Sequence, residues 1–528
     1  MKKIDVVVIL LVSLVLLLSE QLYRFCFGIP LLTFSKLMET GAIFLVFVSI
    51  FRFTKYRFSR YLIILFFFIA HVANNVHYAI YESWLTGMNL YLFFKEFSEV
   101  KNAGLPMLGT LLPCILWGLG DLVIFLMARY RRQKTYWFND VLFVAMMLYI
   151  IIRSFSTYQD HAISPKYSYG KIKSAYFSVG YMLGKILPYQ WLNLSDMPVY
   201  TSNTPPHSQL HDLNIKNIIL VMGESESAIH LDTFGYDRKT SPFISQLKDD
   251  PNALVRSAYA SGFLTSVALP SFFNAIPHPN GLMQIYSGRT NIFNLAQQQH
   301  YKTIFHTAQA EYEMAIINLI GLHWMDEITY PTNYGYPIKE NMPDNQLLPI
   351  FYQMDLDNGK HFVVLHQRGS HAPYGKYLTP EERVFGDDVF DQYDNTIYNT
   401  DRFLQKVYEH LSKRPDNDWL LIYTSDHGQY VTKAVANQGT DHEDSYLVPL
   451  VIYTRNEALK EKIAKTFDHC QRSTHQQLAT FIIQIMGYDM PIADCTSAAV
   501  NRMITGDLGY LKIDMIQNTK TWIYPKKH

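Results

Sequence analysis

Long apolar runs occur only in the first part of this 528-residue chain. Up to about residue 155, five runs reach roughly 20 residues with their flanks, enough to cross a bilayer as a helix. Beyond that point the apolar residues come in short groups between polar turns. The sequence therefore predicts a membrane domain followed by a water-soluble one. The five predicted spans are residues 5–20, 34–52, 60–80, 107–128 and 140–156.

Basic residues lie at alternate ends of these spans. They gather at the N-terminus and in "RFTKYRFSR" (52–60) and "RYRRQK" (129–134). An excess of Lys and Arg marks cytoplasmic loops, so we expect a cytoplasmic N-terminus and an uncleaved first span. Five spans then place everything after about residue 157 on the outer side of the membrane. In a Gram-negative cell, where this membrane would be the bacterial inner membrane, that compartment is the periplasm.

We divide the chain into a transmembrane domain (1–157), an interfacial bridging segment with a linker (158–212), and a catalytic domain (213–528). The bridging segment mixes Lys with Tyr, Phe and Trp, as segments at the membrane interface do. A plain linker helix packed on the soluble domain is the alternative. The Pro-containing stretch "TSNTPPHSQLHD" (201–212) indicates the domain boundary.

Composition excludes some classes of protein. Formal net charge is +0, which gives no support to nucleic acid as a partner. The 4 cysteines show no CxxC spacing, so zinc-finger and redox motifs are absent. Cys470 and Cys495 are the pair expected outside the membrane, where thiols tend to pair. We predict a disulfide between them, with two separate buried thiols as the alternative.

The second part of the chain alternates strand-like and helix-like segments. Runs rich in Val, Ile, Leu and Tyr are typical of strands buried on both faces. They lie at 217–222, 361–366, 419–424 and 447–453, and an amphipathic helix is expected at 393–414. This alternation predicts an α/β sandwich with a largely parallel central sheet.

In such sheets chemistry collects at the carboxyl ends of the strands. Three of the predicted strands are followed there by Glu224, by His371, and by Asp426 with His427. Carboxylates and imidazoles brought to one edge suit zinc, or manganese as an alternative. Taken singly, each residue could equally serve as a capping or hydrogen-bonding group.

A nucleophile is expected in "SAYASGFLTSVALPSFFNAIPH" (257–278), where a turn of small residues leads to Thr265 and Ser266. A hydroxyl at the start of a helix lies at the positive end of the helix dipole, which favours phosphate esters. A nearby metal would lower the pKa of that hydroxyl. The alternative role is a helix N-cap.

These segments together resemble a known family. "VMGESESAIHLDTFGYDRKTSPF" (221–243), "ASGFLTSVALPSFF" (260–273), "GSHAPY" (369–374), "YDNTI" (393–397) and "SDHG" (425–428) look like the phosphoethanolamine transferases of Gram-negative envelopes. That family lies in the alkaline phosphatase and sulfatase superfamily. Five spans and a periplasmic catalytic domain extend the resemblance over nearly the whole chain.

The resemblance implies roles for individual residues. Glu224, Thr265, Asp426 and His427 would be the ligands of one zinc ion, Thr265 would also be the nucleophile, and His371 would face the phosphoethanolamine group. The implied reaction moves phosphoethanolamine from phosphatidylethanolamine through a threonine-bound intermediate to a sugar hydroxyl of lipooligosaccharide. The sequence looks most like the enzymes that modify inner-core heptose, and less like those that modify lipid A.

Two departures from the family pattern stand out. Ser261 and Ser271 occupy positions where the lipid A branch has cysteines. Gln438 stands where the family has the histidine of an "LHG" motif, and His442 follows four residues later as a candidate for substrate binding. The departure leaves the presence of a second metal open.

Other functions remain as alternatives. A sulfatase would need the C/S-x-P-x-R pattern, which "LTSVALPSFF" lacks. A phosphoglycerol transferase of the lipoteichoic-acid-synthase type would share the five spans and the threonine, and a non-catalytic envelope scaffold would bind no metal. We expect a monomer in the inner membrane, with phosphatidylethanolamine as donor and lipooligosaccharide or lipid A as acceptor.

Overall fold

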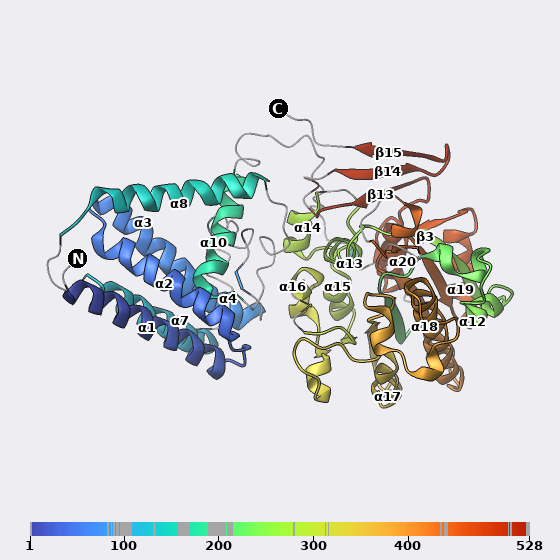
Figure 1. The fold of residues 1–528 in the computed structure, drawn as a ribbon. Coiled ribbons are helices and arrows are strands. Elements are labelled where there is room, and N and C mark those ends of the chain that lie inside the picture. Colours follow the sequence, from blue (N-terminus) through green and yellow to red (C-terminus); the bar gives the residue numbers. More distant parts are fainter. Residues whose placement is uncertain are drawn as a thin grey trace. The chain divides into compact units, whose positions relative to one another are not determined.

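A computed structural model describes most of the chain. The described residues are 3–81, 84, 85, 87, 90, 94, 108–129, 134–156, 169–187, 207–208, 215–277, 280–311, 313–314, 316–432, 436–437, 442–504, 506 and 509–523. The chain divides into two compact units, residues 1–195 and 196–527, which we call the helical unit and the α/β unit (Figure 1). The predicted linker at 201–212 lies outside the described residues except for the short strand β1 (His207–Ser208).

The helical unit has a helix at each of the five predicted spans. Its elements are α1 (Lys3–Cys26), α2 (Phe34–Phe53), α3 (Arg57–Phe68), η1 (Ile69–Ala73), α4 (Asn74–Tyr81), α7 (Leu108–Met127), α8 (Trp137–Ser156), α10 (Lys171–Tyr181) and η2 (Met182–Ile186). The helices at Lys3–Cys26, Phe34–Phe53 and Arg57–Ala79 are long and apolar enough to cross a membrane, judged over the described residues. Shorter apolar segments lie at Leu111–Met127 and Trp137–Tyr149. A membrane domain of five spans therefore remains a proposal.

Charged side chains are buried inside the helical unit, where each requires compensation. Arg24 pairs with Glu20, and His71 lies 2.8 Å from Asp121. Glu20 also accepts a hydrogen bond from the backbone N–H of Lys171, the first residue of α10. The part of the bridging segment that the structure describes is thus a helix whose N-terminus is fixed to α1.

The α/β unit is built on an eight-stranded sheet in the order β11-β3-β10-β7-β2-β6-β4-β5. The strands are β2 (Asn217–Gly223), β3 (Ala253–Tyr259), β4 (Tyr301–Thr307), β5 (Glu327–Thr329), β6 (Lys360–His366), β7 (Trp419–Ser425), β10 (Leu447–Tyr453) and β11 (Ser473–Thr474). β10 runs antiparallel to both neighbours, and the other adjacent pairs are parallel. The sheet is mixed and mostly parallel, and the four predicted strands are present within one residue of their predicted ends.

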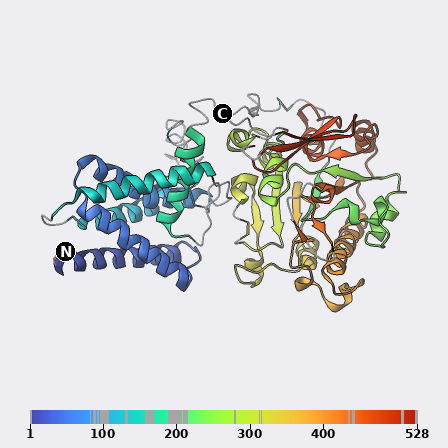
Figure 2. The same cartoon turned by 45° about the horizontal axis from the view of Figure 1, so that its top comes forward.

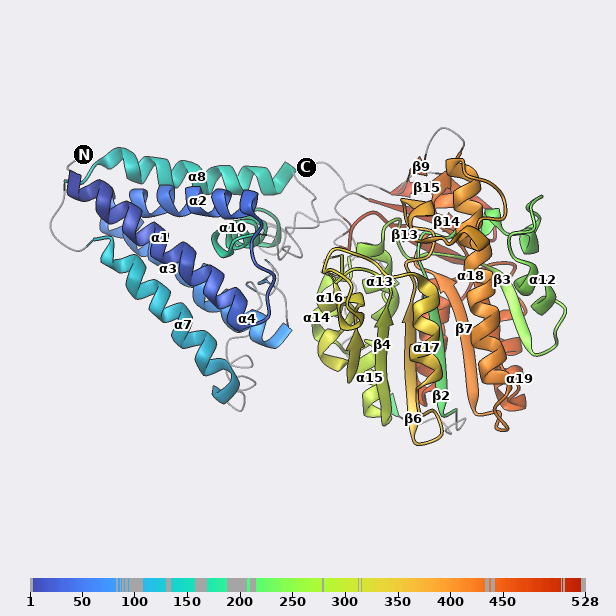
Figure 3. The same ribbon diagram turned by 60° about the horizontal axis from the view of Figure 1, so that its bottom comes forward.

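Helices cover both faces of this sheet. They are α12 (Pro242–Leu247), α13 (Thr265–Phe273), α14 (Leu282–Ser287), α15 (Ile292–Gln298), α16 (Ile317–Ile320), α17 (Leu347–Tyr352), α18 (Val389–Ser412), α19 (Glu457–Phe467) and α20 (His475–Ile485). Even-numbered β2 residues such as Leu220 pack against α13, α15, α19 and α20, whereas Ile219 and Val221 pack against α12, α17 and α18. Figure 3 shows α17 and α18 over one face of β4, β6, β2 and β7. Both faces are buried, which explains the uninterrupted apolar runs of the central strands.

A small antiparallel sheet ends the described chain. It consists of β13 (Ser497–Asn501), β14 (Tyr510–Asp514) and β15 (Thr519–Ile523), drawn in red in Figure 2. Asn501 donates its backbone N–H to Ser261 O, and Phe263 donates its own to Asn501 O. The segment that precedes Thr265 is thereby held against the edge of this sheet. Two further strand pairs are β1 with β12 (Tyr488–Asp489) and β8 (Tyr430–Val431) with β9 (Ala436–Asn437).

The predicted pairing of the two cysteines is confirmed. Cys470 and Cys495 form a disulfide that links the segment before β11 to the segment before β13. Cys26 and Cys114 are free, the first exposed and the second buried.

Candidate functional site

The carboxyl ends of β2 and β7 bring three acidic and imidazole side chains together. Glu224 directly follows β2, and Asp426 and His427 directly follow β7, its parallel neighbour. All three side chains are fully buried, and their ligand atoms lie within 4.8 Å of one another. His427 Nε2 is 3.5 Å from Glu224 Oε1 and 3.5 Å from Asp426 Oδ2. The expectation that functional side chains follow the carboxyl ends of the strands therefore identified Glu224, Asp426 and His427, whose side chains lie together.

Thr265 completes this cluster from the first residue of α13. Its Oγ1 lies 3.0 Å from Glu224 Oε2 and 3.2 Å from His427 Nε2. The N-cap residue of α13 is Leu264, and no side chain caps the helix. The alternative role of Thr265 as an N-cap is thus wrong, because its hydroxyl points to the cluster.

Hydrogen bonds fix the orientation of each group. Asp426 Oδ1 accepts the backbone N–H groups of Ser225 and His427, at 3.0 and 2.7 Å, whereas its Oδ2 is buried and has no hydrogen-bond partner. His427 Nδ1 lies 2.7 Å from the carbonyl of Gly428, to which it donates. The Nε2 atom is then left to face Glu224, Asp426 and Thr265.

The cluster favours positive charge. Burial opposes the charged form of His427, yet the two carboxylates beside it outweigh this effect and raise its pKa. Burial and the adjacent negative charge of Glu224 raise the pKa of Asp426 to about 7. Burial also acts on Glu224, but His427 and His371 reverse its effect and lower the pKa to about 2. Two carboxylates in so small a buried space are stabilised by a cation.

The residues present fit a divalent metal ion. Four ligand atoms at about 2.0–2.2 Å from a tetrahedral zinc lie roughly 3.3–3.6 Å from each other. The distances among Thr265, Glu224, His427 and Asp426 that the structure gives, 3.0 to 3.5 Å, are close to this spacing. Asp426 Oδ2 is buried and accepts no hydrogen bond, so a cation bound by the cluster would also satisfy this atom.

His371 lies on the loop that follows β6. Ser370 donates its backbone N–H to the Glu224 carbonyl at 2.8 Å, so this loop passes over the cluster. Gly369 has φ +54°, and a Cβ there would lie 2.8 Å from the Glu224 backbone, so glycine permits the close approach. The His371 side chain is half-buried, and its charge contributes to the low pKa of Glu224.

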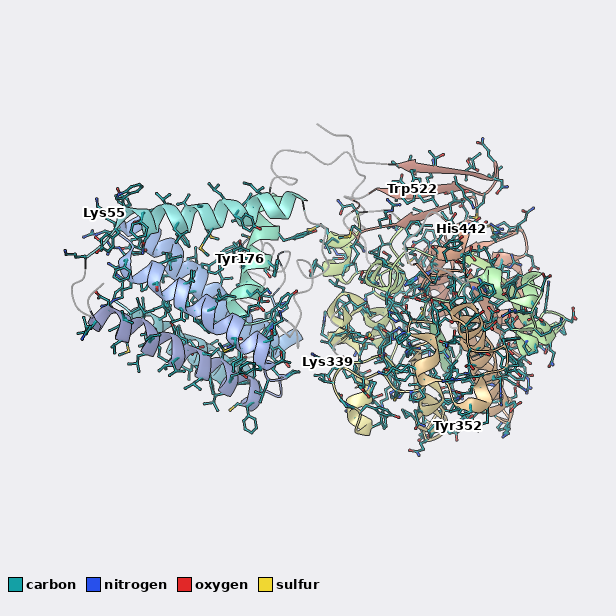
Figure 4. The ribbon with its side chains drawn as sticks, viewed as in Figure 1. Lys55, Tyr176, Lys339, Tyr352, His442 and Trp522 are labelled. Carbon is teal, nitrogen blue, oxygen red and sulfur yellow. A yellow bond between two sulfur atoms is a disulfide. The ribbon has the colours of Figure 1, made fainter. Side chains whose placement is uncertain are left out.

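His442 lies on the turn before β10, and its side chain is 58% exposed. Its Nδ1 is 2.6 Å from Asp444 Oδ2, and its ring stacks on Tyr430 at 4.2 Å between centroids. Figure 4 shows His442 on the side of the α/β unit that carries β13–β15. Gln438, the other residue singled out in this segment, lies outside the described residues.

Several buried residues that sequence reasoning missed surround the cluster. Gln309 donates to Glu224 Oε2 at 2.9 Å, and Ser225 Oγ donates to Glu224 Oε1 at 2.7 Å. His475 accepts the backbone N–H of Ser261 at Nδ1. Gln309 comes two residues after β4, a strand that the apolar runs did not predict. With β4 recognised, the strand-end rule would have pointed to this residue as well.

A comparison with protein families decides where the chain belongs. The model of the family described as Sulfatase matches residues 216–488, which is more than half of the chain. The chain belongs to the sulfatase family. The expected membership of the alkaline phosphatase and sulfatase superfamily is thereby confirmed, and all four residues of the cluster lie within the matched segment.

Curated proteins similar to this sulfatase-family chain include phosphoethanolamine transferases. Kdo(2)-lipid A phosphoethanolamine 7''-transferase of Escherichia coli (strain K12) is 23% identical over an alignment of 309 residues, and the match covers 52% of this chain and 52% of that protein. Phosphoethanolamine transferase EptC of the same strain is 24% identical over an alignment of 264 residues, and the match covers 45% of each chain. The chain spans about half the length of the curated relatives it matches.

Solved structures of such proteins are also similar to this sulfatase-family chain. Lipooligosaccharide phosphoethanolamine transferase A (EptA) from Neisseria meningitidis, an integral membrane protein, is 19% identical with a TM-score of 0.41, and the match covers 92% of this chain and 96% of that one. The periplasmic domain of EcEptC from Escherichia coli, solved in complex with Zn, is 19% identical with a TM-score of 0.47. That match covers 62% of this chain and 99% of that domain.

Proposed function

We propose that this protein transfers phosphoethanolamine from phosphatidylethanolamine to a sugar hydroxyl of lipopolysaccharide or lipooligosaccharide, with Thr265 as the nucleophile. The observation that carries the proposal is the Thr265 hydroxyl lying between Glu224 and His427 in a buried cluster that favours positive charge. Two similar curated proteins are phosphoethanolamine transferases, which supports the choice of the transferred group.

Glu224, Thr265, Asp426 and His427 would hold one zinc ion. Two carboxylates, an imidazole and a hydroxyl suit zinc, with manganese as the harder-ligand alternative. When bound, the ion would lower the pKa of the Thr265 hydroxyl and neutralise negative charge on the phosphoryl oxygens. Metal analysis of the purified protein would show whether a second metal ion binds.

The first half-reaction uses the position of Thr265. Its Oγ1 attacks the phosphorus of phosphatidylethanolamine, the Oγ1–P bond forms, and the bond from phosphorus to the glycerol oxygen breaks. Thr265 loses its hydroxyl proton, and diacylglycerol leaves with a proton on its glycerol oxygen. The phosphoethanolamine group is then held as an ester of Thr265.

In the second half-reaction a sugar hydroxyl attacks the same phosphorus. The Oγ1–P bond breaks, the hydroxyl of Thr265 is restored, and the sugar carries the phosphoethanolamine group. His371, on the loop over Glu224, and His442, exposed on the turn before β10, are the side chains that we assign to substrate binding. Inner-core heptose is the favoured acceptor and lipid A the second.

A lipid donor requires a site at the membrane surface. We infer five spanning helices, a cytoplasmic N-terminus, and an α/β unit in the periplasm, with residues 1–157, 158–212 and 213–528 as the transmembrane, bridging and catalytic parts. Three helices that meet the length and hydropathy of a span support the membrane domain. The protein is proposed to act as a monomer.

The deciding experiment is mass spectrometry of core oligosaccharide and lipid A from cells with and without the full-length protein. We expect one added phosphoethanolamine on core oligosaccharide when the protein is present. An unchanged pair of spectra, together with no turnover of labelled phosphatidylethanolamine by the purified protein, would refute the proposed activity. Turnover of labelled phosphatidylglycerol instead would identify a phosphoglycerol transferase.

A further inference from the structure

The side-chain nitrogen of Gln309 faces two atoms that can only accept a hydrogen bond. Gln309 is 6% exposed, and its Nε2 lies 2.9 Å from Glu224 Oε2, 3.1 Å from the Gln367 carbonyl and 3.3 Å from His366 Nε2. Glu224 Oε2 and the carbonyl can only accept. The opposite amide orientation would place the oxygen against both, so the nitrogen must face them.

His366 Nε2 is the third atom close to the side-chain nitrogen of Gln309. Its Nδ1 lies 2.9 Å from Thr307 Oγ1, and that hydroxyl oxygen also accepts the backbone N–H of Gln309 at 3.0 Å. Burial lowers the pKa of His366 to about 4, so the ring is neutral near pH 7. In the tautomer whose Nδ1–H donates to Thr307, the lone pair of Nε2 faces Gln309. The amide has two N–H groups, and the Glu224 carboxylate and the Gln367 carbonyl by themselves determine its orientation.

This arrangement constrains the two oxygens of Glu224 differently. Oε2 accepts from Gln309, whereas Oε1 lies 3.5 Å from His427 Nε2 and accepts from Ser225 Oγ. Gln309 is itself fixed by β4 and β6, through Thr307 and the Gln367 carbonyl. A carboxylate that could rotate would lose the spacing to His427 and Thr265 that a metal ion needs.

We propose that Gln309 is a positioning residue, which holds the Glu224 carboxylate through Oε2 and so sets the affinity of the cluster for a divalent cation. The inference rests on the proposed metal site. It concerns the hydrogen bond rather than the bulk of the side chain, so substitutions of equal size can test it.

The test compares the affinity for zinc alone of full-length, detergent-solubilised wild type, Gln309→Met and Gln309→Glu by competition with a chromogenic chelator. Met keeps the length of Gln and removes the donor. Glu keeps the shape and places a carboxylate against Glu224 Oε2 and the Gln367 carbonyl. Since hydrogen-bond partners of metal ligands typically change affinity by about 10- to 100-fold, we expect roughly 10-fold weaker binding for Met and about 100-fold for Glu.

Gln367→Met is the matched control. Gln367 is fully buried and contacts the Gln309 side chain through its backbone carbonyl, so the zinc affinity of this variant should stay within about twofold of wild type. The melting temperature of each metal-free variant shows whether the fold survives. If Gln309→Met does not fold, Gln309→Asn, which keeps the donor on a shorter side chain, takes its place and should also weaken binding.

The outcomes separate this inference from the proposed function. Zinc affinities of Gln309→Met and Gln309→Glu equal to that of a zinc-binding wild type would overturn the positioning role. The same holds if lower metal-free melting temperatures accompany unchanged affinities, since Gln309 would then act through packing alone. A wild type that binds no zinc would instead refute the proposed metal site.

Discussion

The hydroxyl of Thr265 lies between a carboxylate and an imidazole, so replacing it removes a reactive group and little packing volume. Thr265→Ala should reduce transfer by at least about 10³-fold, because no other group at that position forms the phosphoester. Thr265→Ser should keep partial activity. Turnover of labelled phosphatidylethanolamine measures both, and a melting temperature near that of wild type checks the fold. Normal turnover by Thr265→Ala would move the role to Ser266 or to water.

His475 is a buried residue whose protonation should affect stability in acid. It accepts the backbone N–H of Ser261 at Nδ1 and lies 3.3 Å from Thr424 Oγ1, so both nitrogens of the neutral ring are used. Burial lowers its pKa from 6.5 to about 3. The unfolded chain therefore binds one more proton than the native protein between these values.

Because the folded pKa is depressed, stability from His475 is complete above about pH 6.5 and is lost as the pH falls toward 3. The free energy of unfolding should drop by up to about 1.4 kcal/mol per pH unit from this group. Denaturant unfolding of His475→Gln between pH 7 and 4.5 should show a slope smaller by one proton than wild type. Equal slopes in the two proteins would show that His475 titrates normally.

At the residue scale, the sequence pointed to Glu224, Thr265, Asp426 and His427, and the structure brings their side chains together. Their roles as metal ligands remain predictions. The strand-end rule worked because β2 and β7 are parallel neighbours, which places their carboxyl ends side by side. Gln309 was not predicted from the sequence, because it follows β4, a strand whose apolar pattern is interrupted by Lys302 and His306.

At the scale of elements, the buried ion pair between Glu20 and Arg24 anchors the start of α10. Glu20 Oε1 accepts from Arg24 and from the backbone of Lys171, and Arg24 also donates to the carbonyls of Pro30 and Tyr169. Arg24→Met should cost about 3–5 kcal/mol of stability, since it leaves Glu20 charged and buried. Adding Glu20→Gln to that variant should recover part of the loss.

Thermal unfolding of the four proteins in a double-mutant cycle measures this coupling. Lys36→Met is the control, because Lys36 and Glu39 form a half-exposed pair that should contribute less than about 1 kcal/mol. If the double variant lost the sum of the two single losses, Glu20 and Arg24 would not act as a pair.

The disulfide links two elements at the edge of the α/β unit. Cys470 and Cys495 are separated by 25 residues, and closing a loop of that length contributes roughly 3–4 kcal/mol from chain entropy. The Cys470→Ser, Cys495→Ser variant should unfold at a lower temperature than wild type. At low temperature it should keep its zinc and most of its activity. Loss of zinc binding at low temperature would show that the bridge also holds the cluster.

Strands with uninterrupted apolar runs could be predicted from the sequence, whereas short strands and strands interrupted by polar residues could not. β2, β6, β7 and β10 carry continuous apolar runs because two layers of helices cover them. β3 contains Arg256 and Ser257 and is only half-buried along most of its length, and β5 and β11 are short, so none gives that signal. The antiparallel direction of β10 could not be predicted from the sequence either, since the direction of a strand depends on the path of the chain and not on its apolar content.

At the scale of the whole molecule, a metal bound only by the folded α/β unit should stabilise the protein by mass action. Zinc at 100 times its dissociation constant should add about 2.7 kcal/mol to the free energy of unfolding. Metal-free protein titrated with zinc in thermal unfolding would show this shift, and metal analysis should find about one tightly held zinc. The Asp426→Ala, His427→Ala variant should show no shift. Full zinc occupancy in that variant would refute the ligand assignment.

The reversed direction of β10 changes which part of the chain is displayed beside the cluster. Between two parallel strands, a helix carries the chain back to the start of the next strand. Only the residues that directly follow the first strand then lie beside the cluster. Between β7 and β10 no such return is needed, because the chain leaves at Ser425 and re-enters at Leu447 on the same edge. Backbone contact fastens the two ends, since a Cβ on Gly428 would lie 1.9 Å from the Asp444 carbonyl. Both ends of the connection between β7 and β10 are therefore held together beside His427, and the chain returns to the cluster there without a crossover helix.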